Sequence, residues 1–281
     1  LSSTAVIGQA AGETHLRVVS QTPDETVLRL DLFGTVRTTV TTPRGQAVTL
    51  SMQNGTPLLI AGAPDLPKYA TALMIPAKGN MALEILAADY EDFTGVEVAP
   101  SKGDLKRNVD PSRIAYEYGG AYAKDEFFPA RPADLQQPFV LRDARGQALW
   151  LYPIRYNPVT KTLRVYSSMT VRIYAAGGAG QNELPAPGKR AESRTFQQLY
   201  QKLFVNYNAS IEKRGGWTPE KMLVIAKDEF LEALEPLVIW KRQMGIETTV
   251  VPLSEIGSSE SGAIYNYVQQ YYAQHGITYL L

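Results

Sequence analysis

MLVIAKDEFLEALEPLVIWKRQMGIETTVV, residues 222–251, contains the clearest change of pattern in the chain. It begins with a continuous apolar run, which is typical of a strand covered on both faces. Phe230, Leu234 and Leu237 then recur at helical spacing and would share one face of a helix that ends at Gly245. A second apolar strand follows the helix. The stretch therefore predicts a β-α-β unit of a parallel sheet with a right-handed crossover.

The same pattern continues to the end of the chain. Asp228 can cap the first helix, and Ser258 or Ser259 can cap a second one. ITYLL (277–281) is typical of a third strand. The β-α-β-α-β order predicts the opening part of an α/β domain, which we place at residues 215–281 and expect to be incomplete.

The chain before about residue 176 has a different pattern, in which short β-rich runs alternate with turn residues. Pro43-Arg44-Gly45 is typical of a hairpin turn, and so is Asn157-Pro158-Val159-Thr160 between runs at 148–156 and 162–175. Many short strands with no helix between them predict an antiparallel β-sandwich, so the fold class is mainly β. The clearest runs are VLRLDLF (27–33), VRTTVTT (36–42), AVTLSM (47–52) and LRVYSSMTVRIYA (163–175).

Two polar stretches, 177–193 and 209–221, separate these regions. Between them, apolar residues at helical spacing predict a short helix at about 194–207. We therefore expect two domains. The first, residues 1–214, is the β-sandwich with this helix at its C-terminal end, and the second is the incomplete α/β domain.

Composition excludes several classes of function. The chain has 28 Lys and Arg and 28 Asp and Glu, so no net charge draws it to nucleic acid or to an anionic membrane. It has no cysteine, which excludes a disulfide, a thiolate metal site and a cysteine nucleophile within these residues. No apolar run approaches the roughly 20 residues that a membrane-spanning helix needs.

Few residues could carry catalysis or bind a metal. The two histidines are His15 and His275, and no G-x-S-x-G elbow supports a Ser-His-Asp triad around His275, which suits a helix C-terminus better. Asp89, Glu91 and Asp92 could hold calcium, but no full loop pattern surrounds them and solvated charge is favoured. The turn AKDEF lacks the glycines of a dinucleotide site. We expect no catalytic residue, metal or cofactor here.

Two basic sites remain. The first is SKGDLKRNVDPSR (101–113), which contains Lys106, Arg107 and Asn108 and, taken alone, is typical of a solvated charged loop. The second is Lys213-Arg214-Gly215-Gly216 in the second polar stretch. An exposed dibasic linker with glycines is a good protease substrate, and a plain linker is the alternative interpretation.

Several blocks of the chain resemble one protein family. The stretch 222–251, with ITYLL, resembles the opening of the catalytic domain of the arginine-specific gingipains, which are secreted cysteine endopeptidases of the Bacteroidetes. The blocks that resemble the propeptide of these enzymes are VAPSKGDLKRNVDPSRIAYEYG (98–119), DEFFP (125–129), PFVLRDARGQ (138–147), YNPVTKTLRVY (156–166), AGQN (179–182) and LFVNY (203–207).

The resemblance implies a β-sandwich propeptide before a caspase-like α/β domain with a parallel sheet. It also implies that the propeptide assists folding and inhibits the protease by placing Arg107, flanked by Lys106 and Asn108, in the specificity pocket. A guanidinium suits such a pocket because it forms charge-assisted, bidentate hydrogen bonds with a carboxylate. Asp110-Pro111 would stiffen the exit of the loop.

The resemblance further implies cleavage near Arg214, with Lys213 before the cut and Gly215 after it. Gly215 and Gly216 are inserted relative to the family's junction, so Lys213 and Arg190 are alternative cut sites. The catalytic histidine and cysteine are expected beyond Leu281, and these 281 residues alone are expected to be inactive.

The partners implied are the cognate catalytic domain of the same precursor and the protein or peptide substrates of the mature enzyme. The location implied is secreted, or on the cell surface of a Gram-negative bacterium, after export through the periplasm. Two alternatives remain. One is a non-enzymatic surface binding module, and the other is a protease-like sortase of the secretion system, which uses a similar domain for transpeptidation.

Overall fold

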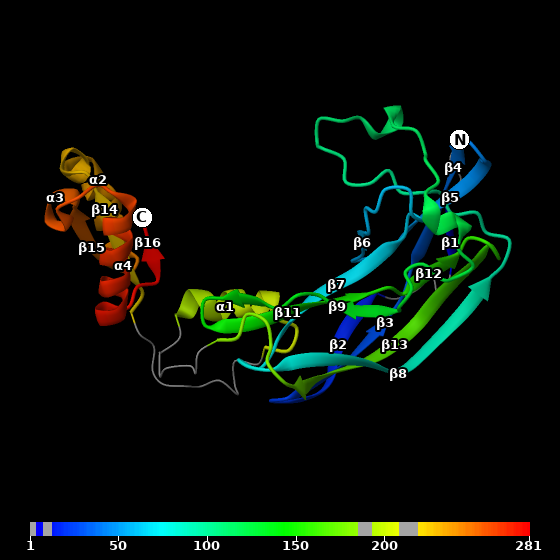
Figure 1. The fold of residues 1–281 in the computed structure, drawn as a ribbon, viewed down its shortest axis with the longest axis horizontal. Helices are drawn as coiled ribbons and strands as arrows, with labels where there is room; N and C mark the ends of the chain where they lie inside the picture. The colour runs from blue at the N-terminus through cyan, green and yellow to red at the C-terminus, as the bar shows by residue number, and fades with distance from the viewer. Residues whose placement is uncertain (1–3, 8–12, 185–192, 208–218) are drawn as a thin grey trace. The chain divides into compact units, whose positions relative to one another are not determined.

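The structure is a computed structural model, and it describes residues 4–7, 13–184, 193–207 and 219–281. Internal contacts divide the chain into two units, each of which is described by itself (Figure 1). The sandwich unit comprises Leu1–Pro187 and Leu203–Tyr207, and the parallel-sheet unit comprises Gly188–Lys202 and Asn208–Leu281.

The sandwich unit contains antiparallel sheets. One five-stranded sheet has the order β12-β13-β3-β2, and β8 pairs with β13 along nearly the whole length of both strands (Figure 1). The strands of this sheet are β2 (His15–Thr22), β3 (Glu25–Asp31), β8 (Asn80–Phe93), β12 (Ile154–Asn157) and β13 (Thr162–Gly177).

A second sheet has the order β10-β11-β7-β6, with β9 also paired to β11, and a third has the order β1-β4-β5. The strands of the second sheet are β6 (Thr56–Pro57), β7 (Pro67–Met74), β9 (Ala133–Leu135), β10 (Phe139–Leu141) and β11 (Ala144–Leu151). The strands of the third are β1 (Thr4–Ile7), β4 (Thr35–Thr42) and β5 (Gly45–Ser51).

Alternating residues of β3 and β13 fill the space between the first two sheets. Leu28 and Leu30 of β3 pack in one buried cluster with Val171 of β13 and with Leu149 and Leu151 of β11. Each buried aliphatic side chain contributes roughly 1.5–3 kcal/mol, so the period-two pattern fixes which face of each strand is inside. The antiparallel β-sandwich predicted from the sequence is confirmed.

The predicted hairpin at Asn157 is also confirmed. Its side-chain Oδ1 accepts hydrogen bonds from the backbone N–H groups of Val159 and Thr160, and β12 and β13 pair on either side. The predicted run at 148–156 is not one strand, because β11 ends at Leu151 and β12 lies in a different sheet. The reason is Pro153, which has no N–H to donate to a ladder.

The parallel-sheet unit contains the predicted parallel sheet, with the order β15-β14-β16. Its elements are α1 (Arg194–Leu203, whose last residue belongs to the sandwich unit), β14 (Lys221–Ala226), η3 (Asp228–Phe230), α2 (Leu231–Gln243), β15 (Glu247–Pro252), α3 (Leu253–Ile256), α4 (Ser261–His275) and β16 (Tyr279–Leu280). Among the helices of the described residues, none is long and apolar enough to cross a membrane.

Three sequence expectations about helix ends are wrong. Asp228 does not cap α2, because its carboxylate instead accepts hydrogen bonds from the backbone N–H and the hydroxyl of Ser254. Ser258 and Ser259 do not cap α4, which begins after Glu260. Helix α1 ends at Leu203 and is shorter than the predicted 194–207.

Candidate functional site

Residues 101–119 form a loop of the sandwich unit, drawn in green in Figure 1, that projects away from the sheets. One short segment holds both ends of this loop. Ser101 N–H donates to the Ala63 carbonyl at 2.7 Å, and Gly62 N–H donates to the Ser101 carbonyl at 2.9 Å. At the other end, Gly119 N–H donates to the Gly62 carbonyl at 2.8 Å. The base of the loop is therefore closed by backbone hydrogen bonds.

The backbones at the base are too close for larger residues. A Cβ on Gly119 would lie 3.0 Å from the Gly62 carbonyl oxygen. Gly62 has a φ of +75°, which a side chain disfavours, and a Cβ there would lie 3.2 Å from Gly119 Cα. Tyr118 adds a polar anchor, since its hydroxyl lies 2.8 Å from Thr42 Oγ1 and its ring 4.0 Å from the Arg44 guanidinium.

The tip of the loop is a β-turn formed by residues 106–109. Val109 N–H donates to the Lys106 carbonyl at 3.0 Å, so Arg107 and Asn108 are the two central residues. Lys106, Arg107 and Asn108 are all exposed. Within the described part of the chain, no residue forms a hydrogen bond or ion pair with the Arg107 guanidinium. The turn thus presents Arg107 to solvent on a loop whose base is fixed.

The other predicted site residues are those of the processing site and its alternative. Lys213, Arg214, Gly215 and the alternative Arg190 lie outside the described residues. The anchoring role of Gly62 and Tyr118 was missed by sequence reasoning. The only local signal was a glycine between two alanines, which indicates a turn but not a contact with Gly119.

His15 does not form a catalytic triad. His15, Asp31, Ser168 and Asp89 are consecutive cross-strand partners on β2, β3, β13 and β8. Neighbouring strands lie about 4.8 Å apart, so His15 and Ser168, on either side of β3, are separated by roughly 10 Å. The Ser168 hydroxyl instead donates to Asp89 Oδ2 at 2.8 Å.

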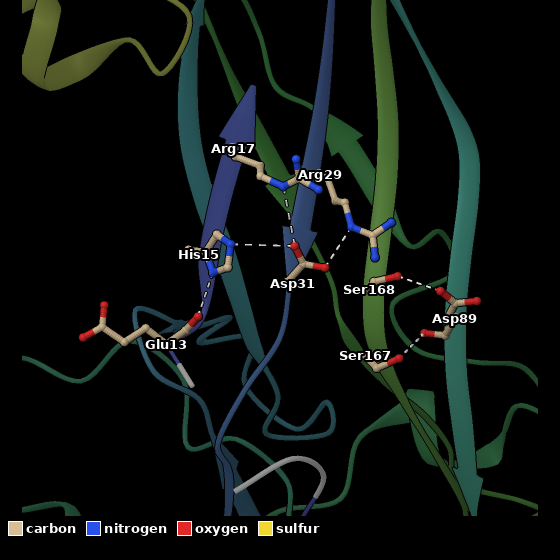
Figure 2. A network of polar contacts seen from close by, with 8 residues as sticks. All are labelled: Glu13, His15, Arg17, Arg29, Asp31, Asp89, Ser167 and Ser168. Carbon is tan, nitrogen blue, oxygen red and sulfur yellow. Dashed lines mark hydrogen bonds and ion pairs between the residues drawn. The ribbon is translucent and has the colours of Figure 1, made fainter. Parts of the chain in front are cut away.

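Figure 2 shows what this row of residues does instead. The Asp31 carboxylate lies near two guanidiniums and one imidazole. Arg29 Nε is 2.8 Å from it, and Arg17 Nε and His15 Nε2 are each 3.8 Å from it. His15 Nδ1 donates to the Glu13 carbonyl. His15 and Arg17 contact Asp31 across strands, and Arg29 contacts it along β3. Such contacts on a partly exposed sheet face typically stabilise a sheet modestly.

Two of the three carboxylates weighed as a calcium site, Asp92 and Asp89, have protein partners. Asp92 accepts two hydrogen bonds of 2.8 Å from Arg164, and this lowers the pKa of Asp92. Asp89 accepts from Ser168. Within the described residues, no group of three or more His, Asp or Glu side chains could hold a metal ion. His275 is the last residue of α4, as expected, and its ring packs 4.5 Å from that of Tyr271.

A polar network in the parallel-sheet unit surrounds Glu220. Its Oε1 accepts from the Ser193 hydroxyl and from Thr195 N–H at 3.0 Å, at the start of α1, and its Oε2 accepts from the Tyr279 hydroxyl at 2.9 Å. Burial acts to raise the pKa of Glu220, but the hydrogen bonds from Ser193, Thr195 and Tyr279 outweigh it and lower the pKa to about 2. Glu220 therefore fastens the first turn of α1 to the sheet.

Two family models match the chain. Propeptide_C25 matches residues 25–214, and Peptidase family C25 matches residues 217–281. The chain belongs to peptidase family C25. It comprises a C25 propeptide followed by the start of a C25 peptidase domain, as the resemblance implied.

Relatives of this C25 chain include the gingipains of Porphyromonas gingivalis. The chain is 35% identical to gingipain R1 over 252 residues, which cover 87% of this chain and 25% of gingipain R1. It is 23% identical to Lys-gingipain HG66 over 235 residues, which cover 80% of this chain and 13% of that protein. The chain thus spans a quarter or less of the length of both.

A solved structure has a similar fold. It is described as a complex of the Porphyromonas gingivalis RgpB pro- and mature domains. The match has a TM-score of 0.64 and 33% identity, and it covers 69% of this chain and 98% of that one. The predicted propeptide sandwich and caspase-like start agree with this match.

Proposed function

We propose that residues 1–214 are the inhibitory propeptide of a secreted, arginine-specific cysteine endopeptidase, and that residues 215–281 begin its catalytic domain. The observation that carries the proposal is the placement of Arg107 at the exposed tip of a loop whose base is anchored. The partner is the catalytic domain of the same precursor. The RgpB structure, a complex of pro- and mature domains, supports this partnership.

Arg107 fits the role of a specificity-pocket plug. Its guanidinium has no partner within the described residues, so no internal contact is lost when it enters a pocket. A carboxylate at the base of that pocket would accept charge-assisted, bidentate hydrogen bonds from it. The turn at Lys106–Val109 already exists in the free loop, which reduces the ordering cost of binding. Lys106 and Asn108 would flank the pocket mouth.

Arginine, not lysine, is the proposed specificity of the mature enzyme. The loop presents Arg107 at its tip, and the identity to gingipain R1 exceeds that to Lys-gingipain HG66. The proposed substrates are proteins and peptides. The proposed location is outside the cell or on its surface, after export through the periplasm.

We place the processing cut between Arg214 and Gly215, with Lys213 directly before the cut arginine. The propeptide model match ends at residue 214 and the peptidase model match begins at residue 217, which supports a junction in this interval. Incubating the chain with mature gingipain R1 and sequencing the new N-terminus tests the assignment. Arg214→Ala should abolish the cut, while Arg190→Ala should leave it intact. A cut that persists in Arg214→Ala would move the site to Lys213 or Arg190.

The inhibitor assignment is tested by titrating the 281-residue chain against mature gingipain R1 with a small arginyl substrate. We expect competitive inhibition, and no peptidase activity from the chain alone because it contains no cysteine. Absence of inhibition at concentrations that saturate related propeptide complexes would contradict the proposed function and favour a surface binding module.

A further inference from the structure

The loop that carries Arg107 is braced from within by Lys102. Its Nζ donates a hydrogen bond to the Pro111 carbonyl at 2.7 Å and lies 4.2 Å from the centroid of the Tyr116 ring. The contact with Pro111 closes a ring of chain that contains the whole turn at residues 106–109. A long side chain in water keeps one conformation only if its contacts offset the lost rotamer entropy. The Lys102 ammonium has two such contacts, the Pro111 carbonyl and the face of the Tyr116 ring.

Asp110 braces the exit of the turn. Its Oδ1 accepts from Ser112 N–H at 2.9 Å, and its backbone carbonyl accepts from Arg113 N–H at 3.1 Å, so it caps the short helix Pro111–Arg113. The hydrogen bond from Ser112 lowers the pKa of Asp110, with a smaller contribution from the charge of Lys102. Pro111 fixes its own φ at the start of this helix. The backbone conformation directly after the turn is therefore fixed.

The peptide bond between Arg107 and Asn108 is the central bond of the braced turn. In a β-turn the first and fourth Cα atoms lie within about 7 Å, whereas four residues of an extended strand span roughly 10 Å. Proteases bind the residues around the bond they cleave in an extended form, by strand addition. The turn must therefore open by roughly 3 Å before that bond can be cleaved.

We propose that Lys102 and Asp110 hold the Arg107–Asn108 bond in this turn, so that Arg107 fills an arginine pocket without its peptide bond being cleaved. The inference rests on the proposed function of Arg107. Cleavage requires a nucleophile to attack the carbonyl carbon of Arg107, after which the C–N bond breaks, the amine of Asn108 takes a proton, and water releases the new carboxylate. Attack requires the nucleophile and the carbonyl carbon to be close and correctly aligned, and the closed turn prevents this alignment. Lys102 and Asp110 are positioning residues.

The first experiment measures cleavage without assuming that the chain inhibits anything. The 281-residue chain is digested briefly with trypsin, which also binds arginine in a pocket, and cleavage of the Arg107–Asn108 bond is followed by mass spectrometry. Since cleavage follows the population of opened loops, loss of one brace should raise the rate about fivefold. We expect this for Lys102→Met and for Asp110→Ala. Asp110→Asn keeps an acceptor for Ser112 and should restore most of the resistance.

Two control variants match these changes. Asp104→Ala removes an exposed carboxylate from the same loop, and Lys124→Met removes an exposed ammonium elsewhere in the sandwich unit. Both should leave the rate of Arg107–Asn108 cleavage within about twofold of the parent chain. Equal rates for Lys102→Met, Asp110→Ala and the controls would overturn the inference.

The second experiment separates this inference from the proposed function. The parent chain and the two brace variants are incubated with mature gingipain R1, and inhibition is followed for several hours. We expect lasting inhibition by the parent and inhibition that decays, with cleavage after Arg107, for Lys102→Met and Asp110→Ala. If the parent chain does not inhibit, the proposed function is wrong. The trypsin rates would still test whether Lys102 and Asp110 hold the turn closed. Equally lasting inhibition by all three chains would contradict the brace alone.

Discussion

Arg145 is a buried cation whose removal should destabilise the sandwich unit strongly. The residue is 1% exposed. Its Nη1 donates to the carbonyls of Pro76 at 2.9 Å and Gly79 at 2.8 Å, and its Nε and Nη2 donate to the Gln181 carbonyl at 3.2 and 2.6 Å. One side chain thus joins β11 to two loops that are far apart in the sequence.

The size of the effect follows from these four hydrogen bonds. Arg145→Met keeps the aliphatic stem but leaves three carbonyls without their donor. Hydrogen bonds from a charged donor contribute about 1.5–3 kcal/mol each. Part of this sum is offset because the methionine variant no longer carries the desolvation cost of a buried charge. We expect a loss of about 3 kcal/mol in the free energy of unfolding, which is in the range found when a buried polar network is broken.

Urea denaturation of the 281-residue chain measures this loss. With a slope of about 2 kcal/mol per molar urea, the midpoint of the sandwich unit should fall by about 1.5 M. Arg131→Met is the matched control, because the Arg131 side chain is 78% exposed and forms a surface ion pair with Asp134, so its loss should cost at most about 0.5 kcal/mol. A cost below about 1 kcal/mol for Arg145→Met would refute the reasoning.

Two further predictions concern the loop base and the Glu220 network. Gly62→Ala should lower the free energy of unfolding by about 1–2 kcal/mol, because Gly62 has a φ of +75° and faces Gly119, whereas Gly120→Ala, with open space around it, should cost less than about 0.5 kcal/mol; equal urea midpoints would contradict this. Glu220→Gln should cost about 1–2 kcal/mol at pH 6, allowing for its partial exposure. The pKa of Glu220 is depressed to about 2, so this stabilisation exists above the unfolded value of about 4.3, and the difference from the parent chain should vanish as pH falls to about 2. A difference that does not change with pH, or an equal cost for the exposed Glu235→Gln, would contradict the assignment.

The architecture could be predicted because periodicity reports burial directly. The alternation in β3 and β13 predicted the inner faces of the sandwich, and the apolar run of β14 predicted the centre of the parallel sheet. The run at 148–156 was mistaken for one strand because both halves have the same pattern and only Pro153 separates them. The caps failed for a different reason. Asp228 finds its partner, Ser254, after the next strand, where local spacing gives no signal.

The candidate site could be predicted only in part. Charge pattern alone left Arg107 in a solvated loop, and the resemblance to the gingipain propeptide assigned its role. Gly62 was missed because its partners, Ser101 and Gly119, lie far from it in the sequence. Lys102 was missed because no known motif joins a lysine to a carbonyl nine residues later. Hydrogen bonds join some of the sequence blocks that carry the resemblance to one another. Arg145 in one block binds the Gln181 carbonyl in another, and Asn157 donates to Asp125 at 2.8 Å.

The inhibition constant of the 281-residue chain against mature gingipain R1, compared between the parent and Arg107→Ala, tests the central claim most directly. Loss of a buried, charge-assisted contact should cost about 2–4 kcal/mol, so Arg107→Ala should bind at least about thirtyfold more weakly. Arg113→Ala removes an exposed guanidinium from the same loop and should bind within about threefold of the parent. If Arg107→Ala inhibits as tightly as the parent chain, Arg107 is not the group that occupies the specificity pocket.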